Sequence, residues 1–142
     1  MTNFRFSKRS LENLKGVHPY LVGVVVNALK CNTTVDFTVI EGLRTRERQQ
    51  ELFKKGTTKT LNSKHCNQQT GFGHAVDLLP YLSGVSSEEI WNKKEAFKAV
   101  SDAMFKSAKD LGIKIRWGGD WNQNGRSDDE TFYDGPHFEL IS

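Results

Sequence analysis

Cysteine is scarce in this sequence, and neither Cys31 nor Cys66 belongs to a C-x-x-C pair. The arrangement excludes a thiolate zinc site of that type and a dithiol redox motif. In a protein made in the cytoplasm we expect both thiols to be free, the alternative being one Cys31–Cys66 disulfide.

Long apolar segments are also missing. The N-terminus has no apolar core of signal-peptide length, and the most apolar run, Leu21 to Leu29, is too short to cross a bilayer. We therefore expect a protein made in the cytoplasm without a signal peptide and without stable membrane association. A substrate outside the cell would be reached only through another factor.

The chain has no block of lysine and arginine, and its formal net charge is only +3. This disfavours nucleic acid as a partner and suits a polyanionic one, such as a cell envelope with acidic polymers. With 142 residues, of which 37% are hydrophobic, the chain predicts one domain over residues 1–142, and we expect a monomer.

The order of the periodic segments predicts an α+β domain, with helices packed on a small, mostly antiparallel sheet. The predicted helices are 7–14, a second starting at Pro19, 45–55 and 90–111; the predicted strands are 36–41, 73–79, 113–117 and 137–141. A capping box at 86–89 precedes the last helix, whose expected buried stripe is Phe97, Val100, Met104 and Leu111.

Three residues with metal-binding side chains are His65, Asp77 and His137. Two imidazoles and a carboxylate can bind zinc and leave a fourth position for water. Asp134, three residues before His137, can supply a carboxylate that takes the proton of that water. The alternative is that each is an ordinary structural or solvated residue, and spacing alone does not decide between the two interpretations.

Several motifs in order resemble a family of zinc peptidases. That family contains D-alanyl-D-alanine carboxypeptidases and dipeptidases and the L-alanyl-D-glutamate endopeptidases of phage lysis. The shared motifs are Ser63-x-His65, Gly73-x-Ala75-x-Asp77 and Asp134-x-x-His137. Further motifs resemble the phage endolysin branch: Gly42-Leu43-Arg44-Thr45, Gly118-Gly119-Asp120-Trp121 and Tyr133-Asp134-Gly135-x-His137.

The resemblance implies a role for each matching residue. His65, Asp77 and His137 correspond to the zinc ligands, and Asp134 corresponds to the general base. Arg44 corresponds to an arginine that holds substrate or the developing oxyanion, the alternative being a salt bridge at a helix start.

Two further residues are candidate substrate contacts. Ser63 is one, unless it only shapes its loop. Trp117 is the other, unless it packs in the core.

One spacing departs from the family pattern. Direct counting back from Gly73 places the first ligand at Thr70, so we infer a loop insertion after His65. His74 is the competing ligand. On a strand, however, it would point to the opposite face from Asp77, which favours His65.

The segment 120–130 resembles a calcium loop, with oxygen-bearing side chains at its first, third and fifth positions and glycine at its sixth. The expected calcium ligands are Asp120, Asn122, Asn124, Arg126, Asp128 and Glu130. The twelfth position is Thr131 rather than glutamate, and the alternative is a solvated turn. We expect calcium to order this loop and so to activate the enzyme.

These observations together predict a zinc-dependent endolysin that cuts the L-alanyl-D-glutamate bond of the peptidoglycan stem peptide. It would act in the periplasm after the membrane is permeabilised, without a separate wall-binding domain. The alternatives are a D-alanyl-D-alanine carboxypeptidase or dipeptidase and a non-catalytic wall- or calcium-binding module. A metal-dependent nuclease is weaker, since it needs a more concentrated basic surface.

Overall fold

The computed structural model describes residues 3–56, 63–66, 68, 70–120, 123 and 133–141. Its helical elements are α1 (Lys8–Asn13), α2 (Pro19–Asn27), the π-helical turn η1 (Ala28–Asn32), α3 (Arg46–Lys54), the 3-10 turn η2 (Glu89–Asn92) and α4 (Lys94–Leu111). Its strands are β1 (Asp36–Glu41), β2 (Ala75–Tyr81), β3 (Ile115–Trp117) and β4 (His137–Leu140). Within the described part of the chain, no helix is both long and apolar enough to span a bilayer.

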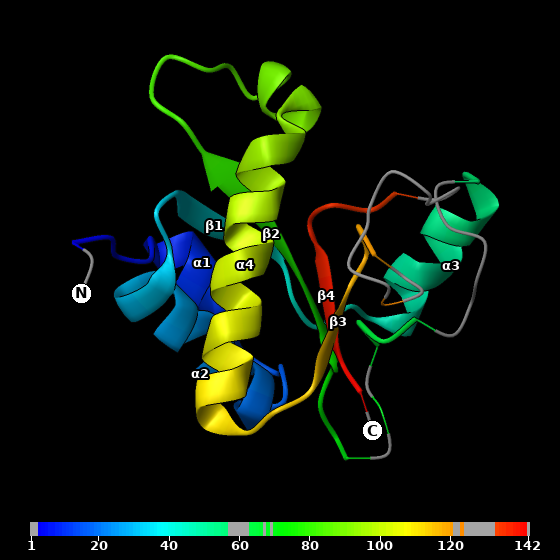
Figure 1. Cartoon of the computed structure of the whole chain (residues 1–142). Coiled ribbons are helices and arrows are strands. Elements are labelled where there is room, and N and C mark those ends of the chain that lie inside the picture. The colour runs from blue at the N-terminus through cyan, green and yellow to red at the C-terminus, as the bar shows by residue number, and fades with distance from the viewer. Residues whose placement is uncertain are drawn as a thin grey trace.

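The four strands form one sheet in the order β1-β2-β4-β3, and each neighbouring pair is antiparallel. Figure 1 shows α4 crossing the strands with α1 and α2 beside it, while α3 lies apart, beyond β3 and β4. This is the predicted α+β arrangement of helices on a small antiparallel sheet.

Side chains alternate between the two faces of the sheet, and the two faces differ in chemistry. On β4, Phe138 and Leu140 join the apolar core, whereas His137 and Glu139 occupy the alternate positions. Asp77 lies between two core residues of β2 in the same way. One face of the sheet therefore supports the core, and the other carries ionisable groups.

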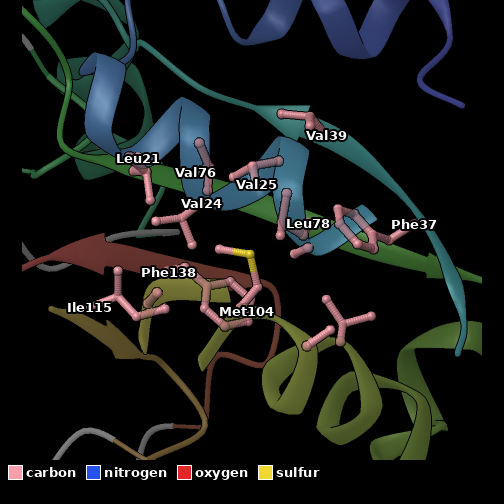
Figure 2. Close-up of a cluster of buried hydrophobic side chains, with 14 of the residues drawn as sticks. Leu21, Val24, Val25, Phe37, Val39, Val76, Leu78, Met104, Ile115 and Phe138 are labelled. Atoms are coloured by element: carbon pink, nitrogen blue, oxygen red, sulfur yellow. The ribbon is translucent and has the colours of Figure 1, made fainter. Parts of the chain in front are cut away.

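The core forms where α2, η1 and α4 cover the apolar face. Figure 2 shows side chains from α2, β1, β2, α4, β3 and β4 converging on one cluster. Its labelled members are Leu21, Val24, Val25, Phe37, Val39, Val76, Leu78, Met104, Ile115 and Phe138. The core lies beneath β2 and β4, so it fixes the strands that carry Asp77 and His137.

The predicted helices at 7–14, from Pro19 and at 45–55 are confirmed by α1, α2 and α3. The side chain of Ser7 caps α1, and the side chain of Thr45 caps α3 by accepting from Arg48 N–H. Pro19 occupies the first turn of α2. Both cysteines are free thiols, as expected.

Two predicted boundaries are wrong. We expected the second strand to end before Pro80, but β2 continues to Tyr81. Because β4 starts opposite Asp77, β2 has only β1 beside it at Pro80, where a missing N–H is tolerated. The last helix begins at Lys94 rather than Ile90, because Lys93 has a non-helical backbone (φ −91°, ψ 71°) between η2 and α4.

The predicted stripe of α4 is right for Phe97, Val100 and Met104, which are buried, but wrong for Leu111, which is 46% exposed. Ala108 is buried one turn earlier. Leu111 is the last residue of the helix, where the left-handed Gly112 turns the chain toward β3.

Candidate metal centre

Asp77 and His137 meet because β2 and β4 pair in register. They are directly opposite each other across the strands, with the Asp77 Oδ1 atom 3.4 Å from the His137 Nδ1 atom. His137 is only 7% exposed. The position of this pair is therefore set by the sheet.

His65 comes from a short loop that backbone hydrogen bonds tie to the segments that follow β1 and precede β2. The carbonyl of His65 accepts from Arg44 N–H at 2.7 Å, and the carbonyl of Lys64 accepts from His74 N–H at 2.7 Å. His65 is 2% exposed, and its Nε2 atom lies 3.2 Å from Asp77 Oδ1.

Among the described residues, one cluster has three or more side chains of the metal-binding types with ligand atoms close together. It consists of His65, Asp77 and His137, and one ligand atom from each lies within 4.8 Å of the others. The sequence prediction selected the residues that the structure brings together.

The hydrogen bonds on the far sides of the rings show how the ligand atoms are oriented. His65 Nδ1 lies 2.9 Å from the carbonyl oxygen of Gly42, which can only accept, so Nδ1 carries the proton. The Nε2 lone pair then faces the carboxylate of Asp77, another acceptor. Two acceptors at this distance need a cation between them, either a proton or a metal ion, and the donor set suits a divalent metal.

His137 has a matching partner in Glu139, whose Oε1 atom lies 2.8 Å from His137 Nε2. The sequence analysis did not identify Glu139. The signal was available: two residues after a ligand on a strand, a side chain points to the same face.

The electrostatics of the cluster follow from this packing. Burial alone would raise the pKa of Asp77, but hydrogen bonds from His137 and His65 hold it well below its usual range. Burial alone would lower the pKa of His137, but hydrogen bonds to Asp77 and Glu139 outweigh it and raise the pKa to about 9. The cluster is thus arranged to hold positive charge beside Asp77.

Asp134 lies at the edge of this cluster. Its backbone N–H donates to Gly118 O, and its carbonyl accepts from His137 N–H. Burial and the negative charge of Asp77 raise the pKa of Asp134, against the opposing effect of His137 and His65. A carboxyl with a raised pKa beside a metal site suits proton transfer.

Arg44 faces the same region and is held firmly. Its Nε and one Nη bond the two carboxylate oxygens of Glu41 at 2.6 and 2.8 Å, and the other Nη donates to Gln49 Oε1 at 2.7 Å. The salt bridge to Glu41 at the start of α3 is the alternative that the sequence left open, although the Arg44 side chain is only 10% exposed; a contact with substrate stays a prediction.

The other predicted site residues have different surroundings. Trp117 is 3% exposed and stacks on Phe138, so the predicted substrate contact is wrong and the core-packing alternative is observed. The hydroxyl of Ser63 accepts from His65 N–H, which fits the alternative that Ser63 shapes its loop. A contact between Ser63 and substrate stays a prediction. His74, the competing ligand, bonds Thr70 and packs against His18 instead.

Most of the expected calcium loop lies outside the described residues. This applies to Asn122, Asn124, Arg126, Asp128 and Glu130; Asp120 is described, and its backbone N–H donates to Trp117 O. Calcium binding stays a prediction from the sequence.

Comparison with known proteins agrees with this geometry. The family model described as phage L-alanyl-D-glutamate peptidase matches residues 1–141. The chain belongs to this family. The L-alanyl-D-glutamate peptidase of Escherichia phage T5 is 38% identical over 145 residues, covering 98% of this chain and 99% of that protein.

Two further relatives of the phage L-alanyl-D-glutamate peptidase family come from bacteria. The peptidoglycan L-alanyl-D-glutamate endopeptidase CwlK of Bacillus subtilis (strain 168) is 30% identical over 136 residues, covering 88% of this chain and 74% of that protein. The crystal structure of the Serratia marcescens L-Ala D-Glu endopeptidase ChiX superposes with a TM-score of 0.77 at 38% identity, covering 98% of this chain and 92% of that chain. The fold of this family member is therefore that of a solved endopeptidase over nearly its whole length.

Proposed function

We propose that this protein is a zinc-dependent endopeptidase that hydrolyses the L-alanyl-D-glutamate bond of the peptidoglycan stem peptide. The observation that carries the proposal is the match to the phage T5 peptidase over the length of both chains. The cluster of His65, Asp77 and His137 supports it independently, because a peptidase of this kind needs a metal site.

The donor set favours zinc over the other common divalent ions. Two imidazole nitrogens and one carboxylate oxygen leave room for a fourth ligand, as in catalytic rather than structural zinc sites. When bound, zinc lowers the pKa of its water to about 7 and polarises the scissile carbonyl. Magnesium and calcium prefer all-oxygen sites.

Asp134 and Arg44 have separate tasks in this proposal. Asp134 accepts the proton of the attacking water and passes it to the leaving amine, a transfer for which its raised pKa is suited. Arg44 uses three of its five N–H donors on Glu41 and Gln49, which fixes its guanidinium. We assign its remaining donors to the substrate or to the oxyanion.

The alternatives place different demands on the site. A D-alanyl-D-alanine carboxypeptidase or dipeptidase would use the same metal cluster but a different bond, so only product analysis separates it. A non-catalytic wall-binding module has no need for a base such as Asp134 beside the metal. We also propose action on the cell wall from the periplasmic side, in line with the phage relative.

Replacement of Asp134 by asparagine tests the proposed chemistry. Asp134→Asn keeps the size of the side chain but removes the base, so we expect kcat on a synthetic L-alanyl-D-glutamyl peptide to fall by about 10²- to 10⁴-fold. Zinc content, measured by elemental analysis, should stay at the wild-type level, because Asp134 is not one of the three ligands.

The matched control is Asp110→Asn, which removes a carboxylate from an exposed i,i+4 pair with Lys106 on α4. It should leave both kcat and zinc content unchanged. Full activity of Asp134→Asn would remove Asp134 from this role, and a wild-type protein that leaves the peptide intact would contradict the proposed function.

A further inference from the structure

Glu139 is a buried carboxylate directly behind the metal cluster. It lies two residues after His137 on β4, so both side chains point to the polar face of the sheet. Its Oε1 atom is 2.8 Å from His137 Nε2, and the residue is 5% exposed. A carboxylate this buried requires compensating partners.

The second partner of Glu139 comes from the neighbouring strand. Arg116 on β3 is the register partner of Glu139, and its Nη2 atom donates to Glu139 Oε2 at 2.7 Å. One carboxylate oxygen therefore faces Arg116, while the other faces His137. This leaves the carboxylate little freedom to rotate away from the imidazole.

The direction of the hydrogen bond between His137 and Glu139 determines which ring nitrogen of His137 is available to a metal. An ionised carboxylate can only accept, so His137 Nε2 carries a proton and its Nδ1 atom faces Asp77. We infer that Glu139, fixed by Arg116, is a positioning residue that holds His137 in the ring orientation and tautomer that bind the metal through Nδ1. The inference rests on the proposed function, because it concerns the ligand set of the same zinc site.

His65 and His137 are held in different ways. The outer nitrogen of His65 donates to a backbone carbonyl, that of Gly42, which no side-chain substitution removes. The outer nitrogen of His137 depends on Glu139, which can be replaced. The orientation of His137 should therefore be the part of the site most sensitive to substitutions outside the ligands.

Glu139→Gln tests the inference, because glutamine has one oxygen where glutamate has two. Its side chain cannot accept from both His137 and Arg116 at the two positions that Glu139 uses. We expect the affinity of the purified protein for zinc, measured by competition with a chelating indicator, to fall by about 10- to 100-fold.

A second readout reports on the ring itself. Long-range ¹H–¹⁵N spectra of the zinc-loaded protein should show a protonated Nε2 on His137 in the wild type, and Glu139→Gln should weaken or lose that signal. The control is Glu51→Gln, which removes a carboxylate from an exposed pair with Arg48 on α3 and should change neither readout. A purely structural role for Glu139 would lower stability without altering the His137 spectrum.

The outcomes separate the inference from the proposed function. If the wild type binds zinc and Glu139→Gln binds it within about two-fold, only the inference is overturned. If the wild type binds no zinc, the proposed function fails with it. Should Glu139→Gln not fold, Arg116→Gln acts from the other end of the chain of hydrogen bonds; unchanged zinc affinity in that variant would overturn the inference.

Discussion

At the scale of single residues, the site is a set of side chains whose protonation and metal binding compete. In the metal-free protein, Asp77 and Glu139 stabilise a second ring proton on His137 and raise its pKa to about 9. A metal bound through Nδ1 must displace that proton.

We therefore predict that zinc binding near pH 7 releases about one proton from His137. The pKa of His137 is raised, so its proton is fully present below about 9 and lost above it. Zinc affinity should accordingly rise with pH up to about 9. Above that pH, deprotonation of His137 no longer adds to the affinity. Isothermal titration calorimetry in buffers of different ionisation enthalpy measures the release; a slope of zero near pH 7 would contradict the assignment.

The site residues differ in how far the sequence could predict them. His65, Asp77 and His137 were predicted from motifs, and His74, the competing ligand, bonds Thr70 outside that cluster. Trp117 was ambiguous, because an aromatic residue on a short strand suits a groove or a core equally well. Glu139 has one local signal, its position two residues after His137, but its second partner, Arg116, is 23 residues away in sequence and lies on another strand.

At the scale of elements, the turn after β3 places Asp134 by close backbone contact. Gly118 N–H donates to His137 O, and Gly118 O accepts from Asp134 N–H, both at 2.8 Å. A Cβ at Gly118 would lie 2.3 Å from the carbonyl oxygen of Asp134. Cβ atoms in real proteins do not approach other atoms so closely, so the backbone at Gly118 and the backbone at Asp134 would have to move apart.

Gly118→Ala should therefore displace Asp134 and affect catalysis more than metal binding. We expect a loss of about 1–3 kcal/mol in the free energy of unfolding and a fall in kcat with zinc content retained. Urea unfolding and peptide hydrolysis measure the two effects.

The control for this substitution is Gly23→Ala on α2, where a Cβ would meet only Leu111 Cδ1 at 3.8 Å. Alanine in a helix interior should leave kcat unchanged and add about 0.5–1 kcal/mol of stability. Wild-type stability and kcat in Gly118→Ala would show that the turn does not position Asp134.

The sequence predicted helices and strands better than it predicted their ends. α1 and α3 each start after a residue whose side chain caps the helix, Ser7 and Thr45, and such a cap is a local feature of the sequence. The extension of β2 through Pro80 depends on which neighbours the strand has there, and no proline or glycine marks the break at Lys93. Neither is readable from a single segment.

At the scale of the whole molecule, one sheet has two separate tasks. Its apolar face, with Val76 and Phe138, packs against α2 and α4 and stabilises the fold. Its other face carries Asp77, His137 and Glu139 on the same two strands. Adjacent residues of a strand point to opposite faces of the sheet. The packed core therefore fixes the positions of Asp77 and His137, although no core side chain takes part in the chemistry.

The bond that is cut is the central claim, and mass spectrometry of digested peptidoglycan tests it most directly. Purified peptidoglycan would be treated with the zinc-loaded protein, with Asp134→Asn as the inactive comparison, and the new peptide ends would be identified. The account predicts new amino-terminal D-glutamate with L-alanine left on the glycan side. Release of terminal D-alanine alone, with no new D-glutamate end, would contradict it.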